Sequence, residues 1–224
     1  MTSGPETDSA AAVADGPARA PLTPEAVLRP GALLDAAQTI LNEHVGRGRR
    51  GLALCAAASG AGVSFVTASL AMAIARAGVS TLVVDANLHR PAMHDLMVPD
   101  APIEGGLLQV LRDEVDPGTV IAEWTAVPNL SVLYAGGSDK GVEDLFDTDA
   151  FHRAMAYCLR TYGLTLIDAP PANRCAETRR IAAVTGYAAI IARRDVSYAE
   201  DITALLADLQ LNRVEVIGTI LNEG

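Results

Sequence analysis

The stretch from residue 52 to residue 91 constrains the fold of this chain more than any other part of it. An apolar run over 52–58 has the length of a buried strand, and the short turn at 59–62, which contains two glycines, follows it. Residues 63–77 then have the length and composition of a helix, and a second apolar run covers 80–84. A strand, a turn, a helix and a second strand in this order predict two parallel strands joined by a crossover helix.

The turn at 59–62 has the character of an anion-binding element. Backbone N–H groups in such a turn, with the N-terminus of a helix behind them, form a cradle whose usual ligand is a phosphate group. One motif of this kind is the dinucleotide fingerprint G-x-G-x-x-G/A, followed about 20 residues later by an acidic residue. Gly60, Gly62 and Asp85 match it, but Phe65 stands where the third small residue belongs.

The competing motif is the P-loop of nucleotide-binding proteins, [AG]-x-x-x-x-G-K-[ST]. Ala57, Gly62 and Ser64 match this pattern, but Val63 stands where the lysine belongs. No shift of the motif along the chain restores that lysine, because Lys140 is the single lysine among the 17 Lys and Arg residues. Each motif is therefore broken at one position, and the rest of the chain has to decide between them.

Further apolar runs of strand length alternate with helical segments along the chain. They cover 129–134, 164–167, 187–192 and 214–221. This alternation predicts an α/β fold, a doubly wound and mostly parallel sheet in three layers, as in P-loop NTPases. Ligands of such sheets bind beyond the carboxyl ends of the strands.

A second carboxylate at a strand end favours the P-loop interpretation. Asp168 ends the run over 164–167, and a P-loop protein uses such a carboxylate to hold Mg²⁺ or its water shell beside the phosphates. A nicotinamide enzyme has no need of it. A short-chain dehydrogenase would also carry a Tyr-x-x-x-Lys pair, and the residue four before Lys140 is Gly136. We therefore predict a magnesium site at Ser64, Asp85 and Asp168.

The predicted phosphate-binding residues form one continuous segment. They are Ser59, Gly60, Ala61, Gly62, Val63, Ser64 and Phe65. The backbone of this segment supplies the cradle, and Val63 and Phe65 place apolar side chains near the expected position of the phosphates.

Composition and charge limit the remaining possibilities. Residues 1–26 are mostly Ala, Pro, Gly, Ser, Thr and acids, which predicts a disordered tail before a single domain at 27–224. The formal net charge of −10 argues against a nucleic-acid partner, and we find no apolar run long enough to insert into a membrane. Three cysteines without C-x-x-C spacing indicate reduced thiols in the cytoplasm. His89 and His94 have no cysteine near them in the sequence, so no metal site is predicted there.

Four segments carry a resemblance to a known family. The most specific is V-V-D-A-N-L-H-R-P at 83–91, against the family's D-A-D-L-R-R-P; the others are at 127–133, 166–171 and 218–222. Over about residues 33–222 the chain resembles the ATPase domain of the bacterial tyrosine autokinases (BY-kinases) of capsule and exopolysaccharide synthesis. These kinases belong to the deviant P-loop group that also contains the MinD and ParA ATPases.

The resemblance implies particular roles and also exposes departures. It implies ATP and Mg²⁺ as cofactors, Asp85 and Asp168 as the catalytic carboxylates, and Asn222 as a residue that contacts the nucleotide base. Against the family pattern, Val63 replaces the P-loop lysine, Phe65 replaces a threonine, and Asn87 replaces the second aspartate of its motif. The P-loop is thus degenerate. The sequence leaves open whether an arginine takes over the role of the lysine.

Two further departures concern assembly and the phosphorylation target. The family's E-x-x-R-x-x-R motif, which the resemblance implies for ring assembly, reads Asp35, Gln38 and Leu41 here, so both arginines are replaced. The C-terminal tyrosine cluster of the family has no counterpart, because the last tyrosine is Tyr198. We therefore expect no self-assembled ring and no autophosphorylation.

Three functions follow as hypotheses. The first is a catalytically degenerate regulator that binds an inner-membrane polysaccharide co-polymerase (chain-length protein) from the cytoplasm and tunes polymer length or export. ATP and Mg²⁺ would then bind weakly or not at all, and Asp85 and Asp168 would be vestigial. The second is an active ATP-dependent tyrosine autokinase of the same pathway. The third is a positioning ATPase of the MinD/ParA type. Such a protein would need an amphipathic membrane helix or a basic surface that faces DNA, and neither is visible in the sequence.

Overall fold

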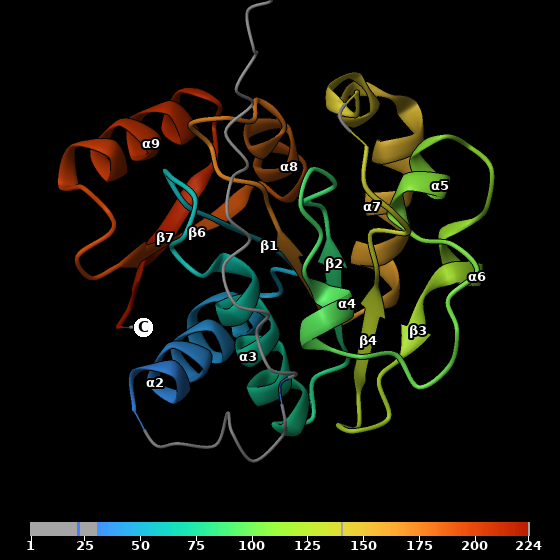
Figure 1. Ribbon diagram of the computed structural model, residues 1–224. Helices are drawn as coiled ribbons and strands as arrows, with labels where there is room; N and C mark the ends of the chain where they lie inside the picture. Colours follow the sequence, from blue (N-terminus) through green and yellow to red (C-terminus); the bar gives the residue numbers. More distant parts are fainter. Residues whose placement is uncertain (1–21, 23–30, 140, 224) are drawn as a thin grey trace, which may run out of the picture.

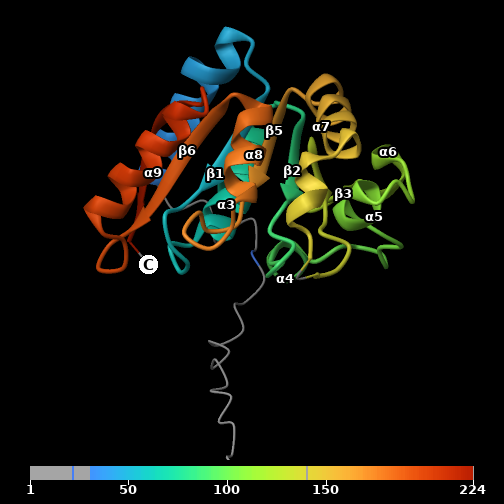
Figure 2. The same ribbon diagram turned by 90° about the horizontal axis from the view of Figure 1, so that it is seen from above.

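The computed structural model describes residue 22 and residues 31–139 and 141–223. Within these residues, seven strands form one sheet in the order β3-β4-β2-β5-β1-β6-β7, with helices on both of its faces (Figures 1 and 2). All neighbouring pairs are parallel except β3 with β4. The predicted α/β class, the doubly wound parallel sheet and its three layers are confirmed.

The strands coincide closely with the apolar runs of the sequence. They are β1 (Gly51–Cys55), β2 (Thr81–Asp85), β3 (Ala122–Glu123), β4 (Leu130–Leu133), β5 (Leu164–Asp168), β6 (Tyr187–Arg193) and β7 (Glu215–Asn222). The sequence did not predict β3, which is two residues long and pairs antiparallel at the edge of the sheet.

The helices connect the strands and cover the sheet. They are α2 (Ala32–Thr39), continued by a π-helix (Ile40–His44) and a 3₁₀ turn (Val45–Arg47), then α3 (Val63–Arg76), α4 (Met93–Leu96), α5 (Leu107–Leu111), α6 (Pro117–Val120), a 3₁₀ helix (Glu143–Asp147), α7 (Asp149–Thr161), α8 (Glu177–Thr185) and α9 (Ala199–Leu211). Among the helices of the described residues, α8 is the one of more than two turns that the sequence did not predict. Arg179 and Arg180 interrupt its buried positions, so the sequence shows no apolar stripe there.

Successive residues of each strand pack into opposite halves of the core. In β1, Leu52 and Leu54 join a cluster with α2, α3 and α4, whereas Ala53 and Cys55 join a second cluster with α5, α7, α8 and α9. All five residues of β1, β2 and β5 are buried, as expected for parallel strands covered on both faces. This two-sided burial fixes the register of the three strands whose carboxyl ends carry the candidate site.

The predicted disordered tail falls largely outside the residues that the structure describes. Residues 1–21 and 23–26 of the predicted disordered tail lie outside the described residues. Leu22 is described: its side chain is buried in the core, and its N–H donates to the carbonyl of Leu96 at 2.9 Å. None of the helices in the described ranges is long and apolar enough to cross a bilayer.

Candidate nucleotide site

The segment between β1 and α3 forms a tight turn at the carboxyl edge of the sheet. Gly60 and Gly62 have φ angles of 90° and 86°, in the region that residues with a Cβ atom rarely adopt. Gly62 also lies so close to the Asn222 side-chain amide that a Cβ atom would collide with it. The sequence Ser59-Gly60-Ala61-Gly62 therefore produces the predicted turn, and α3 begins directly after it at Val63.

The turn is held from the ends of two neighbouring strands. The Asn222 side-chain amide, at the end of β7, donates to the carbonyl of Ala61 at 3.0 Å. The Arg193 guanidinium, at the end of β6, donates to the carbonyl of Gly60 at 3.3 Å. Asn222 thus reaches the site that the family resemblance implied. Arg193 was not predicted, although it ends an apolar strand as Asp85 and Asp168 do, and that shared position was a usable signal.

The two residues that break the P-loop motif have different surroundings. Val63 is partly buried and packs against the core cluster that contains α3. Phe65 is 39% exposed, an unusual position for a large apolar side chain. Replacing the lysine by valine therefore joins the start of α3 to the core, and it leaves an apolar ring on the surface of the site.

The two predicted carboxylates lie directly opposite each other on adjacent strands. Asp85 of β2 pairs in register with Asp168 of β5, and both side chains are fully buried. Because β5 also pairs with β1, Asp168 lies between the turn and Asp85 along the sheet edge. The parallel sheet therefore brings together residues that are 83 positions apart in sequence, from 85 to 168.

Asp85 is tied into the loop that follows it. One carboxylate oxygen accepts the backbone N–H groups of Ala92 and Met93, both at 3.0 Å, and the other accepts the N–H of Asn87 at 3.3 Å. Burial raises the pKa of Asp85 to about 6, while these three N–H groups act in the opposite direction. Asp85 thus organises the segment from β2 into α4 as well as facing the site.

Asp168 has no such support. Neither of its carboxylate oxygens makes a hydrogen bond to any residue that the structure describes. Burial, followed by the charge of Asp85, raises the pKa of Asp168 well above its ordinary value. The Ser64 hydroxyl lies near enough to lower that pKa, although its geometry falls short of a hydrogen bond.

A buried carboxylate without a partner fits a cation. Isolated buried charge is costly, and a divalent ion at Asp168 would neutralise it and relieve its repulsion from Asp85. Carboxylate and hydroxyl oxygens are ligands that Mg²⁺ accepts. The residues predicted for magnesium, Ser64, Asp85 and Asp168, are thus brought together, with Asp168 and Ser64 as the side chains still available to hold the ion.

The arginines near the start of β1 lie away from the turn. Arg49 pairs with Glu215 at 3.1 Å and stacks over the ring of Tyr187. Arg50 donates to the carbonyl of Arg160. Both precede β1 and so belong to the amino edge of the parallel sheet, whereas the turn leaves its carboxyl edge. In contrast to Arg49 and Arg50, Arg193 has a guanidinium that bonds to the turn itself.

Sequence comparisons relate the chain to bacterial tyrosine kinases. No protein-family model matches it. A Staphylococcus aureus protein named as a candidate tyrosine-protein kinase, CapB, is 26% identical over 165 residues, which is 74% of this chain and 71% of CapB. The tyrosine-protein kinase ptk of Acinetobacter johnsonii is 28% identical over 72% of this chain, but the match covers only 22% of that kinase. These homologues confirm the resemblance to the bacterial tyrosine kinases.

Solved structures give the same fold. The kinase domain of Escherichia coli tyrosine kinase ETK superposes with a TM-score of 0.77 at 22% identity, covering 84% of this chain and 74% of that one. The septum site-determining protein MinD of Pyrococcus horikoshii, in complex with Mg-ADP, superposes with a TM-score of 0.64 at 22% identity, covering 77% and 70%. At this identity the likeness establishes the P-loop NTPase fold.

Proposed function

We propose that this chain, a homologue of bacterial tyrosine-protein kinases, is a catalytically degenerate, kinase-like regulator of capsule or exopolysaccharide synthesis. The observation that carries the proposal is the state of the turn before α3. Gly60 and Gly62 keep the positive φ angles of a tight turn ahead of a helix N-terminus, while Val63, at the position of the missing lysine, packs against the core. The shape of the site is kept, and the side chain that would bind and neutralise phosphate is not.

The energetic consequence falls mainly on catalysis. A hydrogen bond to a charged group contributes about 1.5–3 kcal/mol, and the P-loop lysine makes such bonds to the phosphates. It also stabilises the charge that develops during phosphoryl transfer. We therefore propose that ATP and Mg²⁺ bind weakly or not at all, and that Asp85 and Asp168 do not support tyrosine phosphorylation.

The partner and location belong to the same proposal. The regulator would bind an inner-membrane polysaccharide co-polymerase from the cytoplasmic side, without a ring of its own. The replacement of both arginines of the family's assembly motif by Gln38 and Leu41 supports the absence of a ring. Of these two positions, Gln38 is exposed on α2, where its amide donates to the Asn42 side chain.

One observation favours the alternative of an active kinase. The Arg193 guanidinium lies on the turn, and the Asp168 carboxylate, at the same edge of the sheet, has no hydrogen-bond partner in the described part of the chain. If Arg193 swung from the Gly60 carbonyl to a phosphate, it would restore part of the charge that Val63 removes. For the positioning-ATPase alternative, the MinD likeness supports the fold alone.

Calorimetric titration with Mg-ATP tests the proposal. The natural chain should bind weakly, and Val63→Lys with Phe65→Thr should raise its affinity by about tenfold or more, which is the value of one charge-assisted bond. The matched control is Val63→Met with Phe65→Thr, because methionine has a side chain of similar length to lysine but carries no charge. Light scattering of the same samples should show no ring with or without nucleotide.

A second assay separates the regulator from the kinase. Radiolabelled ATP should transfer no phosphate to tyrosine in this chain, alone or with the co-polymerase of the same organism. Tight Mg-ATP binding together with tyrosine phosphorylation by the natural chain would overturn the regulator and establish the kinase. Equal affinities of the lysine and methionine variants would show that the cradle no longer accepts phosphate.

A further inference from the structure

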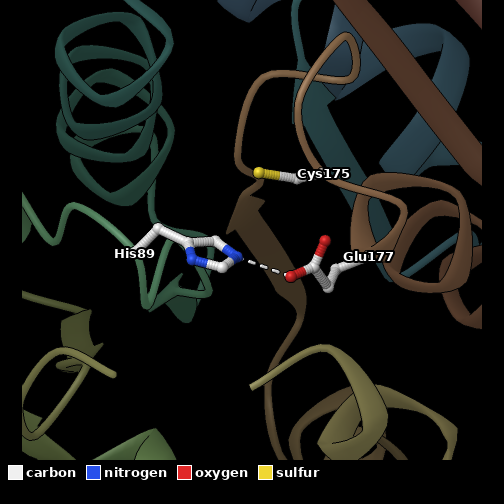
Figure 3. Close-up of side chains that lie close together, drawn as sticks. All are labelled: His89, Cys175 and Glu177. Carbon is white, nitrogen blue, oxygen red and sulfur yellow. Dashed lines mark hydrogen bonds and ion pairs between the residues drawn. The ribbon is translucent and has the colours of Figure 1, made fainter. Parts of the chain in front are cut away.

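Beyond the nucleotide site, we propose that His89, Cys175 and Glu177 form a binding site for a zinc-like transition-metal ion. This three-residue site draws on two segments that are distant in sequence. His89 lies in the loop after β2, Cys175 lies in the segment between β5 and α8, and Glu177 is the first residue of α8. Figure 3 shows the three side chains converging between these segments.

The geometry is compact enough for one ion. One ligand atom from each residue, a ring nitrogen, the thiol sulfur and a carboxylate oxygen, lies within 4.8 Å of the other two. His89 Nε2 and Glu177 Oε1 are 2.6 Å apart and share a hydrogen bond (Figure 3). In a tetrahedral zinc site such atoms stand about 3.4 Å apart, so the ion would replace the shared proton and open this pair by about 0.8 Å.

The chemical types of the donors select the class of ion. Imidazole nitrogen, thiolate sulfur and carboxylate oxygen are the three ligand types of protein zinc sites. Mg²⁺ and Ca²⁺ prefer oxygen alone, so Cys175 and His89 distinguish this cluster from the oxygen ligands at Asp85 and Asp168. The ligand set of the three-residue site therefore favours a divalent ion that is a borderline or soft Lewis acid, such as Zn²⁺.

An unsatisfied buried group points to the same conclusion. The Glu177 side chain is fully buried, and its Oε2 makes no hydrogen bond within the part of the chain that is described. A buried carboxylate with a free oxygen costs free energy of folding unless a cation or donor meets it. Cys175 is buried as well, and its sulfur lies within 4.8 Å of a carboxylate oxygen of Glu177.

The surroundings also leave room for a fourth ligand. The His89 side chain is 27% exposed, so one side of the cluster faces solvent. Three protein ligands with an open fourth position for water is the arrangement of accessible zinc sites. Bound metal would join the loop after β2 to the start of α8, two segments that flank the Asp85 and Asp168 strand ends.

Cobalt substitution provides a direct test on the full chain. Co²⁺ added to the reduced, metal-free protein should bind one ion per chain and give a thiolate-to-cobalt charge-transfer band in the near ultraviolet, with tetrahedral bands in the visible. Zn²⁺ should displace it. Cys175→Ser should abolish the charge-transfer band. His89→Gln should weaken Co²⁺ binding by about 100-fold or more, because losing a ligand costs at least as much as losing a residue that only orients a ligand, which costs up to about 100-fold.

Matched variants control for the other histidines and cysteines. His94→Gln changes an exposed histidine on α4, and Cys158→Ala changes a buried cysteine of α7; both should keep the band and the affinity. Circular dichroism of each metal-free variant checks that it is folded. Zn²⁺ should raise the melting temperature of the natural chain and of Cys158→Ala, but not of Cys175→Ser.

Either of two results would overturn the proposal. One is the absence of a charge-transfer band at Co²⁺ concentrations well above the protein concentration. The other is a band that survives Cys175→Ser in a folded variant, since a different thiol would then hold the ion. Neither result depends on nucleotide binding, so this test stands apart from that of the regulator.

Discussion

The candidate nucleotide site has two halves that differ in how they relate to folding. At the start of α3, directly after the turn, Val63 departs from the motif and packs against the core, which favours the folded state. At the strand ends, Asp168 is a buried carboxyl group whose oxygens have no hydrogen-bond partner among the described residues, and a second buried carboxyl group, that of Asp85, lies opposite it. Folding alone explains the first feature and opposes the second.

This difference guides the interpretation of a degenerate site. The packing of Val63 against the core explains why valine is tolerated at the lysine position, and it gives no evidence that a ligand binds there. A carboxylate that lowers stability needs another reason to be present, and a cation is the simplest one. The two halves can therefore differ in function: the carboxylates at the strand ends can still bind a cation even if the turn no longer binds phosphate.

The largest expected effect separates the two carboxylates themselves. Asp85→Ala and Asp168→Ala both remove one charge from the pair, but only Asp85→Ala leaves three backbone N–H groups without an acceptor. At about 1 kcal/mol or more per lost bond, Asp85→Ala should be less stable than Asp168→Ala by about 3 kcal/mol. Urea unfolding of both variants measures this, and equal stabilities would show that the N–H groups find other acceptors.

The next effect has the opposite sign. Asp168→Asn should raise the free energy of unfolding at pH 7 by about 1–2 kcal/mol, because it removes a desolvated charge and its repulsion from Asp85. Added Mg²⁺ should stabilise the natural chain and leave Asp168→Asn unchanged, which tests the ion without any activity assay. A destabilised Asp168→Asn variant would mean that the carboxylate has a structural role not apparent from its contacts.

The pH dependence of stability follows from the same pair. Burial raises the pKa of Asp85 to about 6 and that of Asp168 well above its ordinary value, so the folded state binds protons more tightly than the unfolded state. The stabilising contribution is complete below about pH 4, where the unfolded carboxyl groups are also protonated, and it is lost as the pH rises through about 6. The difference in stability between Asp168→Asn and the natural chain should therefore widen from pH 5 to pH 8. A constant difference would contradict the raised pKa values.

A moderate effect is expected in the turn. Gly62→Ala places a Cβ atom at a φ of 86° and against the Asn222 amide, so it should lower stability by about 1–2 kcal/mol. Gly186→Ala is a matched control, since Gly186 has a φ of 72° with open space around it. If both variants lose the same stability, the backbone alone is responsible and the packing of Asn222 against the turn adds nothing.

The sequence predicted the framework because its signals were local. Apolar runs, glycines and strand-end aspartates located β1, β2, β5 and the turn, and the parallel order then brought Asp85 and Asp168 to one edge. The distinction between the two carboxylates could not be predicted, because the three N–H partners of Asp85 depend on how the segment from β2 into α4 folds back.

Tertiary contacts account for what else the sequence missed. His89 gave no metal signal, because its partners Cys175 and Glu177 lie more than 80 positions away in the sequence. Arg193 reaches the turn only because β6 is the neighbour of β1 in the sheet. The strand-end position of Arg193 could have indicated the carboxyl edge of the sheet, but its place beside the turn depends on the strand order, which is a property of the whole fold.

The smallest expected effect concerns Arg193, and it tests whether the turn retains any function. Its bond to the Gly60 carbonyl is 3.3 Å long and partly exposed, so Arg193→Met should change stability by about 1 kcal/mol or less. If Arg193 partly replaces the missing lysine, the same variant should weaken any measurable Mg-ATP binding by about threefold to tenfold, whereas Arg194→Met should not. Arg194 is the matched control, because its guanidinium pairs with Glu223 at 2.8 Å on the surface. Equal Mg-ATP affinities of the two variants would mean that Arg193 only stabilises the turn. Any remaining function of the site would then lie with the carboxylates Asp85 and Asp168.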